Sequence, residues 1–258
     1  MGDSFGPEPI LHFDVLDSTN AEARRRAEVG EAGPLWITAS RQTAGRGRRG
    51  REWETGAGNL AATLLTTTDR APAEAAKLSF VMALAVADLA ASVAPEPLVR
   101  VKWPNDVLVD GRKAAGILIE SGPVASGGGL WLAIGVGVNL AHGPAHAERP
   151  ATSLADHLRL QTNAPPTPGQ ALTTLAAGFA RWAALWTERG FPPIRRAWRE
   201  RAYGLGRPCI VRLDRETIEG VAEDLDESGA LVLRLRDGGT RRISAGDVFF
   251  DLARQGAA

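Results

Sequence analysis

The segment from Gln42 to Trp53, QTAGRGRRGREW, constrains the fold most, because it places three glycines and four arginines in one loop. Glycines let a backbone approach a ligand closely or take positive φ. Guanidinium groups bind phosphate and carboxylate oxygens through forked, permanently charged donors. The loop is therefore expected to close over an anion.

Two common phosphate-binding folds do not fit this loop. Its G-x-G-x-x-G spacing matches the dinucleotide-binding fingerprint, which has meaning only where the last glycine begins a helix. The residues after Gly50 hold two further glycines and no apolar residues at helical spacing, so no such helix is expected. A Walker A loop needs a lysine and a hydroxyl where this sequence has Arg51 and Glu52.

The overall charge argues against a protein whose main task is to coat nucleic acid, the usual role of a long basic patch. The chain has 30 Lys and Arg against 30 Asp and Glu, a formal net charge of zero. The basic character is therefore local to the loop.

Cysteine and histidine supply no obvious metal site. The single cysteine, Cys209, excludes an internal disulfide and a cysteine-rich metal centre, and its apolar surroundings predict a buried, inert thiol. His142 and His146 are separated by a Gly-Pro pair, which breaks any helix that could aim both at one metal ion.

The N-terminal residues carry acids and prolines instead of a basic start and an apolar run, so no signal peptide is expected. The most apolar helical stretch, residues 78–93, contains Asp88 and is too short to span a bilayer. We therefore expect a cytoplasmic protein with no membrane partner.

Hydrophobic patterning predicts a mixed α/β chain with a small all-β end. Residues 206–258 contain short apolar runs separated by tight turns, which is typical of a small barrel, so we place a domain boundary near Leu205, between residues 1–205 and 206–258. The predicted strands are residues 10–16, 35–40, 59–67, 99–102, 116–120, 130–138, 209–213, 218–221, 231–235 and 248–250, and the predicted helices are residues 21–29, 73–93, 172–186 and 194–201.

Four segments carry the residues suited to chemistry: DSTN at 17–20, the arginine loop, RVKWPND at 100–106 with GRKAAG at 111–116, and GVGVN at 135–139. Each has an ordinary structural explanation when taken singly. Residues 17–20 can cap a helix, the Trp-Pro-Asn-Asp run can form a rigid turn, and Lys113 can be a solvated lysine.

In combination, the four segments resemble the biotin protein ligases in order and spacing. The arginine loop corresponds to the family's biotin loop, followed by its Lys-Trp-Pro-Asn-Asp segment at 102–106, its Lys-x-x-Gly-Ile-Leu-x-Glu strand at 113–120 and its Gly-x-Gly-x-Asn strand end at 135–139. The resemblance covers essentially the whole chain and implies an α/β (α+β) fold. It consists of a mixed-sheet catalytic domain of the biotin/lipoate ligase type followed by a small SH3-like barrel. Repressor members carry an N-terminal helix-turn-helix domain, for which this sequence leaves no room, so we expect the short form and no nucleic acid partner.

The resemblance implies an ATP-dependent enzyme that activates biotin as biotinyl-5'-AMP and transfers it to a lysine of a biotin carboxyl carrier protein domain of a carboxylase. Lys113, Arg46 and Arg48 are implied as the catalytic cations, because joining a carboxylate to a phosphate requires fixed positive charge. The implied biotin-binding residues are Ser18, Thr19, Asn20, Gln42, Gly45, Arg46, Gly47, Arg48, Trp53, Lys113 and Gly116, and the implied ATP-binding residues are Arg48, Trp53, Asn105, Lys113 and Asn139.

Magnesium is expected to bind together with ATP, held chiefly by phosphates and water. Asp106 is a weak candidate for a metal ligand. Two alternatives stay open: a lipoate-type ligase with the same adenylation chemistry, and a biotin-binding protein without turnover. The retention of Lys113 argues against the second, because a receptor has no anion repulsion to overcome.

Overall fold

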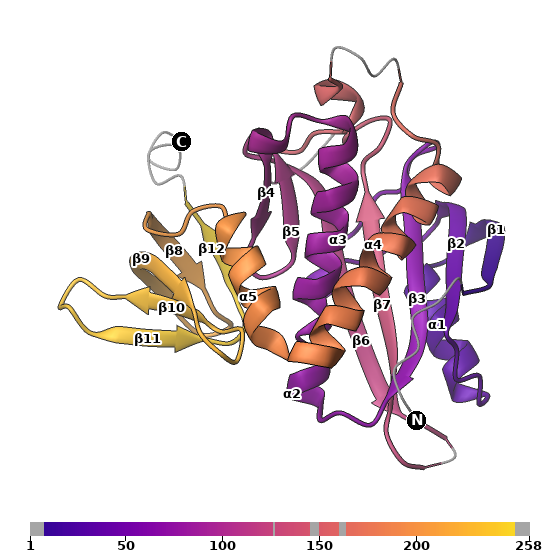
Figure 1. Cartoon of the computed structure of the whole chain (residues 1–258), viewed down its shortest axis with the longest axis horizontal. Coiled ribbons are helices and arrows are strands. Elements are labelled where there is room, and N and C mark those ends of the chain that lie inside the picture. The colour runs from indigo at the N-terminus through magenta and orange to yellow at the C-terminus, as the bar shows by residue number, and fades with distance from the viewer. Residues whose placement is uncertain (1–7, 126, 145–149, 160–163, 251–258) are drawn as a thin grey trace.

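A computed structural model of the chain describes residues 8–125, 127–144, 150–159 and 164–250. Its larger part is a seven-stranded sheet with the order β1-β2-β3-β7-β6-β5-β4, in which β1 runs parallel to β2 and the other neighbours are antiparallel (Figure 1). The mixed sheet predicted from the sequence is confirmed. The strands are β1 Ile10–Leu16, β2 Leu35–Gln42, β3 Leu60–Thr68, β4 Val99–Lys102, β5 Asp106–Val109, β6 Arg112–Pro123 and β7 Leu130–Val138.

Helices cover both faces of this sheet. On one face lie α3 (Leu78–Val93) and α4 (Pro168–Arg189), and on the other lies α1 (Thr19–Glu28) (Figure 1). Alternate residues of a strand point to opposite faces, so the even-numbered residues of β7 from Leu132 onward join the α3 core, while Ala133 packs toward α1. The same alternation brings every odd-numbered residue later in β7 to the α1 face.

Local signals explain where the helices begin and end. Ser18 is the N-cap of α1, and Thr167 forms a capping box with Gln170 at the start of α4. Gly190 ends α4 at φ 70, and α5 (Phe191–Glu200) begins at the next residue. The predicted helix at 73–93 is interrupted at residues 76 and 77, which separate α2 (Pro72–Ala75) from α3.

The C-terminal part is a five-stranded antiparallel sheet with the order β11-β10-β9-β8-β12. Within the described residues its edge strands, β11 and β12, do not pair with each other, so the SH3-like sheet is curved but not closed. Its strands are β8 Pro208–Arg212, β9 Thr217–Leu225, β10 Leu231–Arg234, β11 Thr240–Ile243 and β12 Asp247–Phe249.

One continuous hydrophobic core joins the two sheets. Buried residues of the C-terminal sheet, including Cys209 and Leu233, belong to the same cluster as those of α3. Trp103 donates from its indole nitrogen to the carbonyl of Gly229, 3.1 Å away in the turn between β9 and β10. Burial raises the pKa of the Cys209 thiol to about 11, as expected for an unreactive core cysteine.

The structure contains two strands that sequence patterning misses. Both β5 and β11 are four residues long, and β11 carries arginine at two of its four positions. Strand β6 extends well beyond the predicted 116–120 in both directions. His146, named above with His142, lies outside the described residues, as do residues 1–7, which belong to the N-terminal segment used for the signal-peptide prediction.

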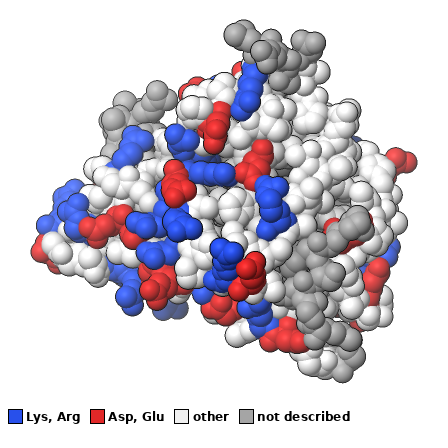
Figure 2. All heavy atoms as spheres, viewed as in Figure 1, with Lys and Arg blue, Asp and Glu red and all other residues white. Residues whose placement is uncertain are grey.

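One stretch of the described residues, Pro72–Val93, is long and apolar enough to cross a membrane by length and composition alone, and 67% of its most apolar window is buried inside the protein. Buried core helices of globular proteins pass the same test. On the face shown in Figure 2, positive and negative side chains are interspersed, with no large region of one sign.

Candidate active site

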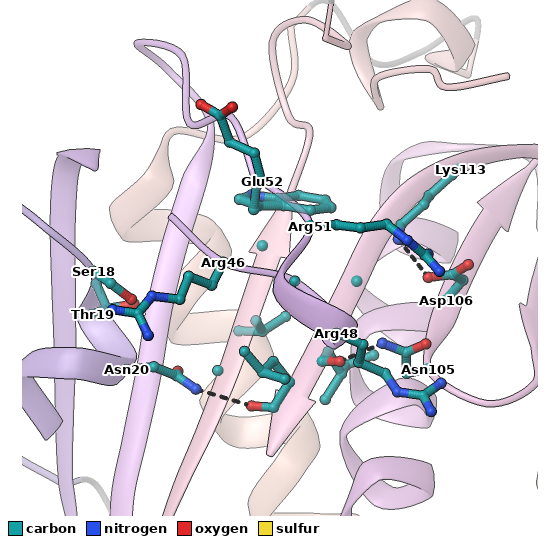
Figure 3. Close-up of a pocket in the computed structure, with 18 of the residues that line it drawn as sticks. Ser18, Thr19, Asn20, Arg46, Arg48, Arg51, Glu52, Asn105, Asp106 and Lys113 are labelled. Carbon is teal, nitrogen blue, oxygen red and sulfur yellow. Dashed lines mark hydrogen bonds and ion pairs between the residues drawn. The ribbon is translucent and has the colours of Figure 1, made fainter. Parts of the chain in front are cut away.

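A pocket opens on the α1 face of the sheet, where β6 and β7 meet the arginine loop (Figure 3). It brings together most of the residues named from the sequence, although these come from segments up to about a hundred positions apart. The predicted residues that line it are Ser18, Thr19, Asn20, Gln42, Arg46, Gly47, Arg48, Trp53, Asn105, Asp106, Lys113 and Gly116.

The arginine loop forms a short hairpin above this pocket. The Trp53 amide donates to the Gly45 carbonyl (2.9 Å), and the Gly47 amide donates to the Arg51 carbonyl (2.7 Å). A side chain on Gly45 would overlap the Trp53 carbonyl, so glycine is required there although Gly45 does not itself line the pocket. No α-helix follows Gly50, which agrees with the rejection of a dinucleotide-binding turn.

One end of the pocket is a buried hydrogen-bonded network. The Gln42 side-chain oxygen accepts from the Thr19 amide (2.8 Å) and lies 3.2 Å from the Thr19 hydroxyl. The Gln42 side-chain nitrogen donates to Thr55 (2.9 Å). Thr63, fully buried on β3, lies 2.8 Å from the Thr19 hydroxyl. The network holds Thr19 in place without a ligand. In this structure the role of Gln42 is therefore to position Thr19.

Asn20 is also committed to the protein. Its amide nitrogen donates to Glu120 (2.7 Å), and its oxygen accepts from Thr63 (2.7 Å). Gly135 makes room for this arrangement, because a side chain on Gly135 would overlap the Asn20 amide. Asn20 therefore supports the wall of the pocket, and a direct bond to biotin stays a prediction.

The Gly-x-Gly sequence of β7 creates the floor of the pocket. Gly135 and Gly137 are two residues apart and so share the α1 face of the sheet. A Cβ on Gly137 would overlap the indole ring of Trp53, and a Cβ on Gly116 would lie 3.2 Å from the same ring. Trp53 can therefore pack closely against β6 and β7 only because both strands have glycine there.

We expect Gly137→Ala to weaken biotin binding about tenfold or more, because overpacking of this kind typically costs about 1–3 kcal/mol and would displace Trp53. Isothermal titration with biotin measures the effect. Gly169→Ala in α4 is the matched control, since an added methyl there meets nothing within 4 Å. An unchanged dissociation constant for Gly137→Ala would show that Trp53 does not need this position.

Lys113 stands at the opposite end of the pocket from Ser18 and Thr19 (Figure 3). Its backbone is fixed by the Pro150 carbonyl and the Thr152 amide, each at 2.9 Å. Its ammonium lies 2.6 Å from Asp106 Oδ1 and 5.4 Å from the centre of the Trp53 ring. Lys113 is thus a cation held against an aromatic wall, facing the space where a ligand would lie.

Asp106 has cationic partners in this structure. Besides Lys113, its carboxylate lies 4.0 Å from Lys102 Nζ, and its residue is only 4% exposed. Among the described residues no group of three His, Cys, Asp or Glu side chains could hold a metal ion. Because magnesium is usually held by one or two carboxylates together with phosphates and water, Asp106 as a metal ligand stays a prediction.

The two arginines predicted to bind ligand differ in exposure. Arg46 is exposed and lies on the Ser18 side of the pocket, whereas Arg48 is partly buried near Asn105 (Figure 3). Burial lowers the pKa of the Arg48 guanidinium, but arginine starts so far above neutrality that the group stays charged. Arg48 also donates to the Gly246 carbonyl of the C-terminal sheet (3.3 Å).

The two asparagines assigned to ATP have structural partners. Asn105 lines the pocket and donates to the Ile117 carbonyl (2.6 Å). Asn139 is 3% exposed, does not line the pocket and donates to the Thr152 carbonyl (3.0 Å). The Thr152 amide in turn donates to the Lys113 carbonyl. Asn139 is therefore linked to Lys113 through the backbone of Thr152.

Several pocket residues were not predicted from the sequence. Arg51 and Asp247 line the pocket, and Asp247 comes from the C-terminal sheet. The sequence did contain a signal for the floor of the pocket. Two glycines, Gly135 and Gly137, lie two residues apart on a buried strand, and glycine within a strand often marks a close approach by a ligand or another part of the chain. Nothing near Asp247 in the sequence points to the loop, because its partner Arg51 is 196 residues away.

Comparison with known proteins finds relatives of both parts of the chain. Residues 13–139 match the Biotin/lipoate A/B protein ligase family, and residues 204–251 match the Biotin protein ligase C terminal domain. The chain is 46% identical over 237 residues to the biotin--[acetyl-CoA-carboxylase] ligase of Paracoccus denitrificans, covering 91% of this chain and 97% of that protein. The chain belongs to the biotin protein ligase family.

A more distant relative supports the same assignment, and a solved structure shares the fold. The chain is 31% identical over 243 residues to the bifunctional ligase/repressor of Escherichia coli, with 93% of this chain and 73% of that protein covered. The fold matches the biotin protein ligase of Aquifex aeolicus, solved in complex with biotin and ATP, with a TM-score of 0.78 at 23% identity, covering 93% of this chain and 97% of that one. The family resemblance stated from sequence motifs is confirmed.

Proposed function

We propose that the pocket beneath the arginine loop is where this biotin protein ligase joins biotin to AMP and then passes the biotinyl group to a carrier lysine. One observation supports this above the others. A single pocket combines a buried hydrogen-bonding end at Thr19, an apolar wall at Trp53 and a cationic end at Lys113. Biotin has the same sequence of properties along its length: a ureido group, an apolar body and a carboxylate.

In the first step, a biotin carboxylate oxygen bonds to the α-phosphorus of ATP, and the bond from that phosphorus to pyrophosphate breaks. Two anions have to meet, so positive charge near the reacting oxygens lowers the barrier. We assign this role to Lys113, with Arg46 and Arg48 closing the loop over the charged groups. Lysine suits the reacting centre because a point charge on a flexible chain can follow oxygens that move.

Lys113 must exchange partners for this step. In the structure its ammonium is paired with Asp106 at 2.6 Å. Biotin carboxylate and the α-phosphate would compete for the same ammonium. The pair therefore orients Lys113, and the neighbouring Lys102 continues to balance Asp106 when Lys113 turns to the ligand.

ATP is expected as its magnesium complex. The described residues offer no cage for the ion, so it would be held by phosphate oxygens and water. We assign no step to it.

In the second step, a lysine amine of the acceptor attacks the acyl carbon of the mixed anhydride, the bond to AMP breaks and the amine loses a proton. The acceptor we propose is a biotin carboxyl carrier domain, because the Paracoccus relative is named for acetyl-CoA carboxylase. We also propose that the reaction takes place in the cytoplasm, where ATP and such a carboxylase are available.

Exchange of labelled pyrophosphate into ATP tests the function directly. Exchange that depends on biotin and not on lipoate is the expected result. Dependence on lipoate would reassign the substrate within the same fold. Tight biotin binding with no exchange would leave a receptor without turnover and would contradict the proposal.

A further inference from the structure

The arginine loop makes two kinds of contact. Arg46 and Arg48 line the pocket, with Arg48 also bonded to the Gly246 carbonyl, whereas Arg49 and Arg51 reach Asp247 of the C-terminal sheet, with Arg51 lining the pocket as well. Both of the latter arginines bind one carboxylate oxygen, Oδ2 of Asp247: Arg49 at 3.1 Å, and Arg51 in a close ion pair. Asp247 therefore joins the C-terminal sheet to two arginines of the loop above the active site.

Asp247 is built into the sheet and not carried on a free turn. It is the first residue of β12, pairs in register with Arg212 of β8 and is 7% exposed. It also lines the pocket itself. A buried carboxylate shared by two guanidinium groups makes strong, charge-assisted hydrogen bonds, and such a group is costly to leave without its partners.

The loop gives up conformational freedom to make these contacts. Arg49 has φ 57, in the left-handed region that favours glycine. It holds that conformation with its side chain bound on three sides, to Asp247, to Asp214 (2.5 Å) and to the Arg212 carbonyl (3.4 Å). Backbone strain of this kind persists where surrounding contacts impose it. The contacts therefore define one position of the loop.

We infer that Asp247 is a positioning residue through which the C-terminal sheet holds the arginine loop over the pocket and so sets how long biotinyl-AMP stays bound. This rests on the proposed function, because the loop covers an adenylate only if the site makes one. It also gives the C-terminal sheet a role in the reaction beyond packing.

The test compares Asp247→Asn with the unaltered protein. Preformed biotinyl-AMP is expected to dissociate about tenfold faster from Asp247→Asn, while its rate of formation changes less, because loss of a buried charge partner acts mainly on dissociation. Glu216→Gln is the matched control. Glu216 lies in the same part of the chain and pairs with Arg241 at 2.5 Å, and both side chains are exposed and do not line the pocket. The control is expected to leave dissociation unchanged.

A double-mutant cycle separates positioning from a general loss of stability. Arg49→Gln and Asp247→Asn should each speed adenylate release, and the double variant should speed it by less than the product of the two single effects, because the Arg49–Asp247 contact is common to both. A purely structural role for Asp247 predicts multiplied effects and a lowered melting temperature instead. Protection of residues 45–53 from hydrogen exchange should fall in both single variants.

The outcomes can be told apart. If the unaltered protein forms no biotinyl-AMP, the proposed function fails. If it forms biotinyl-AMP and Asp247→Asn releases it at the normal rate, the positioning role of Asp247 is wrong. If Asp247→Asn does not fold, Arg49→Gln alone decides the matter, since Arg49 lies on the loop with its side chain 32% exposed.

Discussion

Lys113→Ala is expected to lower the rate of biotinyl-AMP formation by about a hundredfold or more, because removing one fixed donor or cation at developing charge typically costs that much. Biotin-dependent pyrophosphate exchange measures this step without an acceptor protein. Arg112→Ala is the matched control: Arg112 precedes Lys113 on β6, and adjacent residues of a strand point to opposite faces. Near-normal exchange by Lys113→Ala would remove Lys113 from the catalytic role.

The structure adds a stability effect that the sequence did not indicate. A lysine in a surface turn could be truncated at a cost below about 0.5 kcal/mol. Here Lys113 is bonded to Asp106, whose side chain is only 6% exposed. Without Lys113, the Asp106 carboxylate would still have Lys102 Nζ at 4.0 Å. We expect Lys113→Ala to lower the free energy of unfolding by about 1–3 kcal/mol, less than for a fully buried pair because the lysine side chain is 27% exposed.

The double variant Lys113→Ala with Asp106→Asn distinguishes the two effects. Removing the carboxylate charge should restore part of the lost stability, measured by urea denaturation. Adenylate formation should stay as low as in the single variant. Recovery of activity together with stability would mean that the single variant is merely misfolded.

Arg48→Gly is expected to speed the escape of biotinyl-AMP more than it slows its formation. A mixed anhydride hydrolyses in water and acylates stray amines, so the loop has to retain it until an acceptor docks. Arg48 is partly buried between the pocket and the Gly246 carbonyl, where its guanidinium contributes both charge and a link to the C-terminal sheet. Its loss should raise the adenylate dissociation rate about tenfold or more.

The dissociation rate of preformed biotinyl-AMP and the labelling of a bystander protein are the two measurements for this variant. Indiscriminate labelling should rise while labelling of the true acceptor falls. Glycine also adds backbone freedom, so Arg48→Ala separates loss of the side chain from a looser loop, and Arg215→Gly in the exposed β8–β9 turn serves as control. An unchanged dissociation rate in Arg48→Ala would place the clamp elsewhere in the loop.

The positions of Asp106, Asn139 and Asp247 show what could not be predicted. Each is a polar residue whose partner is set by packing and lies far along the chain or across a turn: Lys113 for Asp106, the Thr152 carbonyl for Asn139, and two loop arginines for Asp247. A local pattern records which residues are polar, but it does not say which of several neighbours a buried carboxylate or amide will reach.

The amino-acid sequence by itself determined the family, most of the helices and strands, and most of the predicted pocket lining. It did so because strand and helix periods, glycine spacing and motif order are local properties of the chain. Tertiary structure decided that Gly135 and Gly137 form the floor beneath Trp53, and that the C-terminal sheet contacts the arginine loop through Asp247. Those features depend on how β7, β12 and the loop pack together. The free energy of a buried charged group depends on which partner it contacts, and residue type alone does not fix that partner.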